Sequence, residues 1–208
     1  MLVFLNDRRI RLMNHPPLFV DQSCLTASFL STNQIRELYG FFENDSKISE
    51  LILWSEKKYI KLCKHFLSLF TRIEAAGGLV ENDEGHFLFI YRFERWDLPK
   101  GKIDKKDCHS ARKAAMREVK EETGLKKIRI TAELPETWHI YRQKERLILK
   151  RTSWFRMHAH SGQTLKPQHE EGILTAQWKN KEELDQIMAN TYASLRNMIQ
   201  SSLGSQES

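Results

Sequence analysis

The chain has few cysteines, no long apolar run and no internal repeat. Cys24, Cys63 and Cys108 are its only cysteines, far apart and without a Cys-x-x-Cys pair. This argues against a disulfide framework or a zinc site, so we expect a reducing compartment, the cytoplasm. The opening residues, MLVFLNDRRIRL, hold only a short apolar run before charges, and we expect no signal peptide. No stretch is apolar for long enough to cross a membrane, so we expect no membrane partner.

The composition is that of an ordinary soluble globular protein with a modest basic excess. Its 208 residues fit one ordinary domain or a domain with a smaller companion, and this length is enough to bury a core. Hydrophobic residues make up 40%, an ordinary share for a soluble globular protein. The formal net charge of +6 fits a ligand that carries phosphate, or weak attraction to nucleic acid, without choosing between them. Within this basic chain, an acidic triplet near residue 120 stands out.

The region 1–70 predicts a small α+β unit without recognisable chemistry. Apolar runs that flank an Asn-Asp pair indicate a hairpin, and apolar residues at helical spacing indicate two helices. The expected elements are a hairpin at 2–5 and 10–13, a helix from Ser31 or Thr32 to about Phe42, a strand at 51–54 and a helix at 56–70.

After this unit the chain alternates strands with one strongly charged helix. The expected strands lie at 75–80, 87–91, 128–131, 137–141, 147–157 and 173–178. Asn180 and Glu183 form a capping-box pattern, and a helix follows with apolar residues up to Ile199. We therefore expect a second domain over 71–202 and a frayed polar tail over 203–208.

The segment 101–125 carries the strongest chemical signal. If a helix begins near Ala111, then Glu118, Glu121 and Glu122 stand at i, i+3 and i+4, and three carboxylates share one face. Like charges at this spacing destabilise a helix, whereas a hard cation such as Mg²⁺ prefers clustered oxygen ligands. A solvated acidic face is the competing interpretation, and it would be favoured for an isolated charge run. We interpret the triplet as a metal site.

The sequences LPKG at 98–101 and REVKEETGL at 117–125 resemble the Nudix hydrolase family. The family box reads Gly, five residues, Glu, seven residues, and then Arg-Glu-U-x-Glu-Glu-x-Gly-U, where U is aliphatic. The second half fits at every fixed position, and the resemblance covers roughly residues 73–200. It implies an α+β fold, a mixed β-sheet sandwiched by helices, with the N-terminal region as an appendage of unknown role.

The first half of the box departs from the family pattern. Gly101 to Arg117 is two residues longer than the box allows, which indicates an insertion in the loop before the helix. Counting forward from Gly101 puts Asp107 where the family has its first glutamate, and counting back from Arg117 puts His109 there. In the family this glutamate supports the arginine, so Asp107 or His109 is expected to face Arg117.

The resemblance also implies a set of metal ligands. The implied metal-binding residues are Lys100, Gly101, Glu118, Glu121, Glu122 and Glu171. At Lys100 and Gly101 the ligand would be a main-chain carbonyl, and Glu170 is the alternative to Glu171 as the distal acidic residue. Mg²⁺ is the expected ion and Mn²⁺ the alternative, and no other cofactor is implied.

The implied catalytic residues are Arg117, Glu118 and Glu121. Arg117 would brace the glutamates by charge-assisted hydrogen bonds. Metal ions neutralise the charge of a polyphosphate and make water nucleophilic near neutral pH, and a carboxylate then positions or deprotonates that water. Which glutamate is the base varies within the family, and we favour Glu118.

The substrate is less well indicated. Lysine before the glycine in LPKG resembles the diadenosine-polyphosphate and inositol-pyrophosphate branches. Trp96 and Trp138 are candidates for stacking on a base, and His139 for contacting phosphate, although packing in a sheet explains all three as well. Cations that could grip phosphates, or simply lie at the surface, are Lys102, Lys105, Lys106, Arg142, Lys144, Arg146, Lys150 and Arg151.

The resulting hypothesis is a Mg²⁺-dependent hydrolase of a nucleoside diphosphate linked to another moiety, with a dinucleoside polyphosphate favoured. Alternative substrates are nucleoside triphosphates, ADP-ribose-like compounds and 5′-capped RNA. The rival from another class is a non-catalytic module that senses a nucleotide. We expect a small nucleotide or polyphosphate as the partner rather than a nucleic acid, and a homodimer is an open alternative to a monomer.

Overall fold

The computed structural model describes residues 1–28 and 31–204, and contacts divide the chain into two compact units. Unit 1 comprises Met1–Ile73 and Trp138–Lys150, and unit 2 comprises Glu74–Thr137 and Arg151–Ser208. The domain boundary expected near residue 70 stays a prediction, and unit 1 also takes in a segment that the sequence assigned to the second domain. In the ranges described, no helix has the length and apolar composition needed to cross a membrane.

Unit 1 combines short strands with two helices. Its elements are β1 (Leu2–Leu5), β2 (Arg8–Met13), β3 (Cys24–Ser28), α1 (Thr32–Asn44), β4 (Glu50–Trp54) and α2 (Tyr59–Leu67), with parts of the longer strands β5 (Thr71–Asn82), β9 (Ile128–Gln143) and β10 (Arg146–Ala159). β1 and β2 form the expected antiparallel hairpin, whereas β3 and β4 run parallel to β2 in the order β2-β4-β3. Parallel strands need a crossover, and α1 connects β3 to β4.

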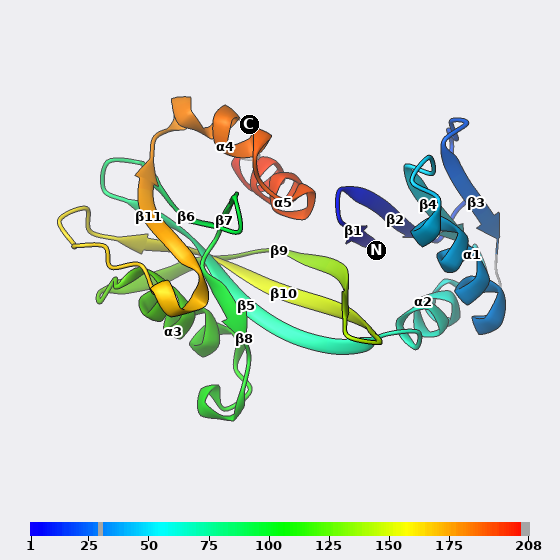
Figure 1. Ribbon diagram of the computed structural model, residues 1–208, viewed down its shortest axis with the longest axis horizontal. Helices are drawn as coiled ribbons and strands as arrows, with labels where there is room; N and C mark the ends of the chain where they lie inside the picture. Colours follow the sequence, from blue (N-terminus) through cyan, green and yellow to red (C-terminus); the bar gives the residue numbers. More distant parts are fainter. Residues whose placement is uncertain (29–30, 205–208) are drawn as a thin grey trace. The chain divides into compact units, whose positions relative to one another are not determined.

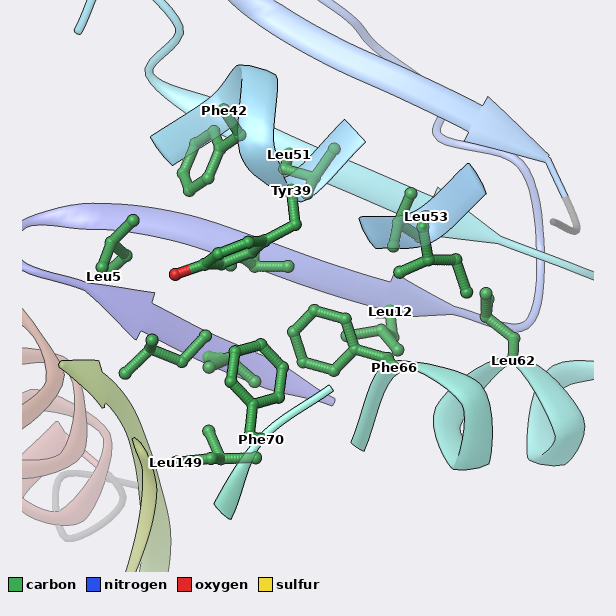
Figure 2. Packing of buried hydrophobic residues seen from close by; sticks show 14 residues of the cluster. Leu5, Leu12, Tyr39, Phe42, Leu51, Leu53, Leu62, Phe66, Phe70 and Leu149 are labelled. Atoms are coloured by element: carbon green, nitrogen blue, oxygen red, sulfur yellow. The ribbon is translucent and has the colours of Figure 1, made fainter. Parts of the chain in front are cut away.

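The start of α1 and the core of unit 1 follow from the sequence pattern. Ser31, one of the two predicted caps, begins the helix: its hydroxyl accepts a hydrogen bond from the Gln34 amide, and the Gln34 side chain accepts one from the Ser31 amide, which makes a capping box. Tyr39 and Phe42 lie on the buried stripe of α1. Figure 2 shows them packing with leucines of the strands and with Phe66 of α2.

Unit 2 is a sheet covered by helices on both faces (Figure 1). Its strand order is β11-β6-β5-β10-β9, with β7 paired to β6 and β8 to β5. The further elements are β6 (Phe87–Arg92), β7 (Arg95–Asp97), β8 (Lys100–Lys102), α3 (Ala111–Thr123), β11 (Ile173–Lys179), α4 (Leu184–Ala189), α5 (Ala193–Gly204) and 3-10 turns at Lys105–Asp107, His169–Glu171 and Lys181–Glu183.

Residues of β6 alternate between the two helical layers. Leu88 and Ile90 join a core cluster with α3, whereas Phe87 and Phe89 join a cluster with α4 and α5. The helices therefore cover opposite faces of the sheet, and the predicted α+β sandwich is confirmed. This arrangement places α3 against the face that carries the candidate site.

Several predicted elements differ from the observed ones. The strands expected at 128–131 and 137–141 are one strand, β9, because the intervening Pro135 is compatible with extended backbone. The last helix is interrupted at Asn190, whose carbonyl accepts the Trp96 amide at 3.0 Å, so the backbone bonds a strand instead of continuing the helix. α5 extends to Gly204, so Leu203 and Gly204 of the expected tail are helical, and the rest of that tail, 205–208, lies outside the described residues.

Candidate active site

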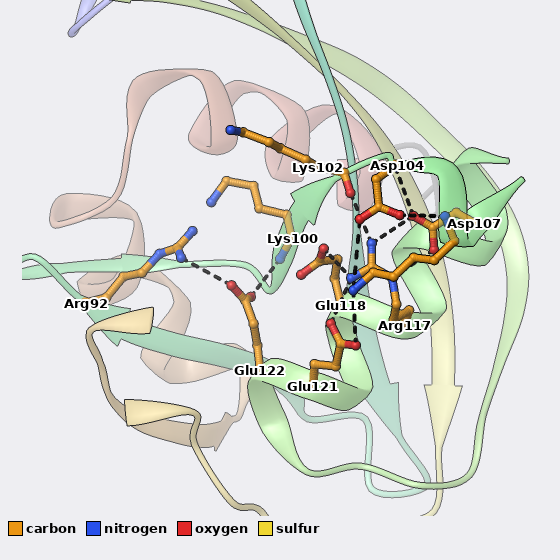
Figure 3. Close-up of polar contacts among 10 residues, drawn as sticks. Arg92, Lys100, Lys102, Asp104, Asp107, Arg117, Glu118, Glu121 and Glu122 are labelled. Atoms are coloured by element: carbon orange, nitrogen blue, oxygen red, sulfur yellow. Dashed lines mark hydrogen bonds and ion pairs between the residues drawn. The ribbon is translucent and has the colours of Figure 1, made fainter. Parts of the chain in front are cut away.

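Arg117 lies at the centre of the site, on α3 beside β8 (Figure 3). Its Nη1 donates to Glu118 Oε1 at 2.6 Å and to Glu121 Oε2 at 2.7 Å. Its Nη2 donates to the Lys102 carbonyl at 3.0 Å, which ties the helix to the strand. We refer to Arg117, Glu118, Glu121 and Asp107 as the Arg117 cluster. The predicted bracing of two glutamates by Arg117 is thus present.

Asp107, and not His109, faces Arg117. Its two carboxylate oxygens accept from Arg117 Nε and Nη2, both at 2.8 Å, and only 3% of its surface is exposed. These hydrogen bonds lower the pKa of Asp107 to about 2. Cys108 and His109 follow with φ angles of 53° and 56°, so a left-handed turn before α3 absorbs the two extra residues. Asp107 therefore occupies the place of the first glutamate of the box.

Glu118 lies against the backbone of Gly101. A Cβ at Gly101 would come within 2.1 to 2.3 Å of the Glu118 carboxyl atoms, so only glycine permits this approach. Burial raises the pKa of Glu118, against the opposing effect of Arg117. A partly desolvated carboxylate of raised pKa suits a general base. Gly77 also permits a close approach, here to a main-chain atom, since a Cβ added at Gly77 would lie 2.4 Å from the Pro99 carbonyl oxygen.

Glu122 is the buried member of the acidic triplet. Its Oε1 accepts from Arg92 Nη1 at 3.2 Å and its Oε2 from the Lys100 amide at 2.8 Å. Burial raises the pKa of Glu122 to about 7, although Arg92 and Lys100 oppose the rise. Lys100 thus contributes its amide to Glu122, and its ammonium binds Asp97. Neither Arg92 nor Asp97 was identified as a site residue from the sequence. The one sequence feature that could have pointed to Asp97 is its charge within the otherwise apolar run WDLP.

Glu170 and Glu171 lie in an exposed 3-10 turn close in the fold to Glu122. The Gln168 amide just before the turn donates to the Glu122 carbonyl at 3.2 Å. Just after the turn, Ile173 pairs with Arg92. The structure therefore brings the predicted distal acidic segment next to the end of α3 through its backbone.

The predicted phosphate-gripping cations divide between the two units. Lys106 lies 3.7 Å from Glu121 and so belongs to the candidate site. Arg142 pairs with Glu43 within unit 1, at 2.6 Å. Arg151 pairs with Glu136 within unit 2. The ion pairs of Arg142 and Arg151 favour a structural role for these two residues.

The aromatic candidates also have structural partners. Trp96 packs edge-to-face on Tyr91 at 5.1 Å, with the Lys179 ammonium 5.1 Å from its ring centre. Trp138 packs against the core of unit 1, and His139 stacks with Tyr141 at 6.3 Å. Packing therefore accounts for each of the three side chains.

Comparison with protein families identifies the family of this chain. The family model described as NUDIX domain matches residues 71–200, more than half of the chain. The chain belongs to the Nudix family. This confirms the resemblance at the level of the family and leaves the branch open.

Two individual relatives agree with this assignment. An RNA pyrophosphohydrolase of a Nitratiruptor species is 40% identical over 73 residues, which are 35% of this chain and 41% of that protein. The match therefore spans well under half of the relative's length. The crystal structure of a C. elegans Ap4A hydrolase binary complex superposes with a TM-score of 0.51 at 20% identity, over 64% of this chain and 96% of that one. At this identity the likeness shows the Nudix fold alone.

The donor chemistry of the Nudix site fits a divalent metal ion. All three side chains of the triplet are carboxylates on one helix face, and Gly101 leaves room for Glu118 and a main-chain carbonyl. As placed, no three His, Cys, Asp or Glu side chains converge on one point within residues 1–28 and 31–204. The Glu118 and Glu121 carboxylates accept hydrogen bonds from the Arg117 guanidinium, and Glu122 accepts from Arg92 and the Lys100 amide.

Proposed function

We propose that this protein is a divalent-metal-dependent hydrolase that cleaves a phosphoanhydride bond in a nucleoside diphosphate linked to another moiety. The observation that carries the proposal is the Arg117 cluster beside Gly101. It supplies a partly buried base candidate, Glu118, and a second carboxylate, Glu121, on the same face of α3, and hydrolysis of a phosphate anhydride requires both a base and oxygen ligands. Asp107 completes the cluster, which supports an intact site over a decayed one.

The proposed residue roles follow from these positions. Glu118, Glu121 and Glu122 would hold the cation, together with a carbonyl near Lys100 or Gly101 and Glu171. When bound, Mg²⁺ or Mn²⁺ neutralises phosphate charge and makes water more acidic.

Glu118 would accept the proton of the attacking water at a carboxylate oxygen, while the water oxygen bonds to phosphorus and the bridging oxygen leaves with the second phosphate. Arg117 would keep Glu118 and Glu121 oriented.

A dinucleoside polyphosphate is the favoured substrate, because LPKG resembles the branch that acts on such compounds. The relative named as an RNA pyrophosphohydrolase makes 5′-capped RNA the leading alternative. Nucleoside triphosphates and ADP-ribose-like compounds complete the set to be tested.

A nucleotide-sensing module is the second candidate function. The observation that favours it is the bonding of Glu118 and Glu121 to Arg117, which occupies two proposed metal ligands. A sensor would bind nucleotide without turnover, whereas the enzyme would release phosphorylated products.

The two candidates separate in one experiment. Purified full-length protein is incubated with Mg²⁺ and each compound of the set, products are followed by chromatography, and nucleotide binding is measured by calorimetry. If the protein is the proposed enzyme, it should hydrolyse at least one compound of the set, and this hydrolysis should stop with a chelator and resume when Mg²⁺ is restored. Tight binding without any hydrolysis would establish the sensor instead.

The proposal includes the cytoplasm as the location, because the three cysteines lack any disulfide-like spacing. A homodimer is included as an alternative to the monomer, and light scattering after size-exclusion chromatography distinguishes the two by mass.

A further inference from the structure

Asp97 is a buried carboxylate outside the Nudix box. Only 2% of its surface is exposed. Its Oδ2 accepts from Arg92 Nε and Nη2 at 3.1 and 3.0 Å and from Lys100 Nζ at 2.5 Å, and its Oδ1 accepts from the Leu98 amide at 2.8 Å. A buried charge is tolerated only when it is paired and hydrogen-bonded, and Asp97 meets this condition through two cations.

The sheet register explains why Arg92 bridges Asp97 and Glu122. Asp97 on β7 pairs with Ile90 on β6, two residues before Arg92, so the Arg92 and Asp97 side chains share a face. That face carries Ile90 into the α3 cluster and directs Arg92 towards α3. One side of the guanidinium binds Asp97, and Nη1 binds Glu122 Oε1 at 3.2 Å. Only the planar fork of arginine can make these contacts together.

We propose that Arg92 and Asp97 are a positioning pair for Glu122. Asp97 anchors the guanidinium, and Arg92 fixes one carboxylate oxygen while the Lys100 amide fixes the other. Each Glu122 oxygen keeps a second lone pair for a cation, so the carboxylate is oriented before a metal ion arrives. The inference rests on the proposed function, because it takes Glu122 as a metal ligand. Partners of metal ligands typically contribute about 10- to 100-fold in affinity.

The test measures Mn²⁺ affinity of the full-length protein by electron paramagnetic resonance. The variants are Arg92→Lys, which keeps the charge and loses the fork, Asp97→Asn, and the double variant. Arg95→Lys is the matched control, because Arg95 pairs with Arg92 across the same hairpin but packs its guanidinium over Tyr192, 5.2 Å from the ring centre. Thermal unfolding of each sample is recorded in parallel.

If Arg92 and Asp97 position Glu122 together, Arg92→Lys and Asp97→Asn should each weaken Mn²⁺ binding about 10- to 100-fold. The double variant should then bind Mn²⁺ no more than about threefold more weakly than the weaker-binding single variant. Arg95→Lys should bind as the wild type does. If Asp97→Asn fails to fold, the comparison of Arg92→Lys with Arg95→Lys decides.

Three results would overturn the inference. In the first, Arg92→Lys binds Mn²⁺ as tightly as the wild type and only its unfolding temperature is lower. In the second, the losses of Mn²⁺ affinity of the two single variants multiply in the double variant, and in the third, the wild-type protein binds no Mn²⁺. Weakened Mn²⁺ binding in the variants of a protein that hydrolyses no anhydride would leave the pair standing and reject the proposed enzyme.

Discussion

Replacing Asp107 by Asn should destabilise the region around α3 in a pH-dependent way. The pKa of Asp107 is lowered from 3.8 to about 2, which corresponds to about 2 kcal/mol of preference for the charged form. Arg117 is 18% exposed, so solvent screening reduces the expected contribution to about 1–2 kcal/mol. We expect Asp107→Asn to lose this amount at pH 7.

The sign of the pH dependence follows from the direction of the shift. A carboxyl group whose folded pKa is lowered stabilises the fold above its unfolded pKa, and this stabilisation disappears as pH falls towards the folded value. The stability gap between the wild type and Asp107→Asn should therefore be full above about pH 4 and close towards pH 2.

Hydrogen exchange of the α3 amides, measured under native conditions at several pH values, reports this gap locally. His109→Ala is the control, since His109 is exposed and lies outside the Arg117 cluster. Equal protection of α3 in the wild type and Asp107→Asn at pH 7, or a gap that persists unchanged at low pH, would refute the role assigned to the Asp107–Arg117 pair.

Three further predictions concern the metal site. Gly101→Ala should weaken Mn²⁺ binding at least about tenfold in a folded protein, because the new Cβ would displace the Glu118 carboxyl, and unchanged binding would contradict the close approach. The pKa of Glu122 is raised to about 7, so between about pH 4.5 and 7 the metal-free folded protein keeps the carboxyl proton that the unfolded chain has lost. The free energy of unfolding, measured with urea, should therefore fall as pH rises through this range. Glu122→Gln should remove this fall. Chelation should abolish hydrolysis and Mg²⁺ restore it; activity that survives chelation would exclude a metal-dependent reaction.

Local and contiguous features of the site could be predicted from the sequence. Arg117, Glu118 and Glu121 are neighbours on one helix, so helical spacing alone brings them together. The predicted capping box of Asn180 and Glu183, which the structure shows, likewise depends on residues three apart. The choice between Asp107 and His109 could not be made, because it depends on the left-handed turn at 108–109, which the spacing of the box does not specify.

The rest of the site depends on contacts that join distant segments. Arg92 contacts Glu122, and Asp97 contacts Arg92, because the β6–β7 register puts both side chains on the face covered by α3. In the sequence alone Asp97 is marked only as a charged residue in the apolar run WDLP, and Arg92 looks like an ordinary charged residue of a hairpin. The interruption of the last helix at Asn190 has the same origin, since it depends on a hydrogen bond from Trp96, far away in the chain.

The most direct test of the proposed function compares turnover by the wild type with turnover by the Glu121→Gln, Glu122→Gln double variant, in Mg²⁺, on the best substrate of the set. Glu133→Gln serves as the control, because Glu133 is 74% exposed and pairs with Arg112. We predict a loss of at least about 100-fold in kcat for the double variant and none for the control. Turnover that survives in the double variant would contradict the assignment of the metal site to α3.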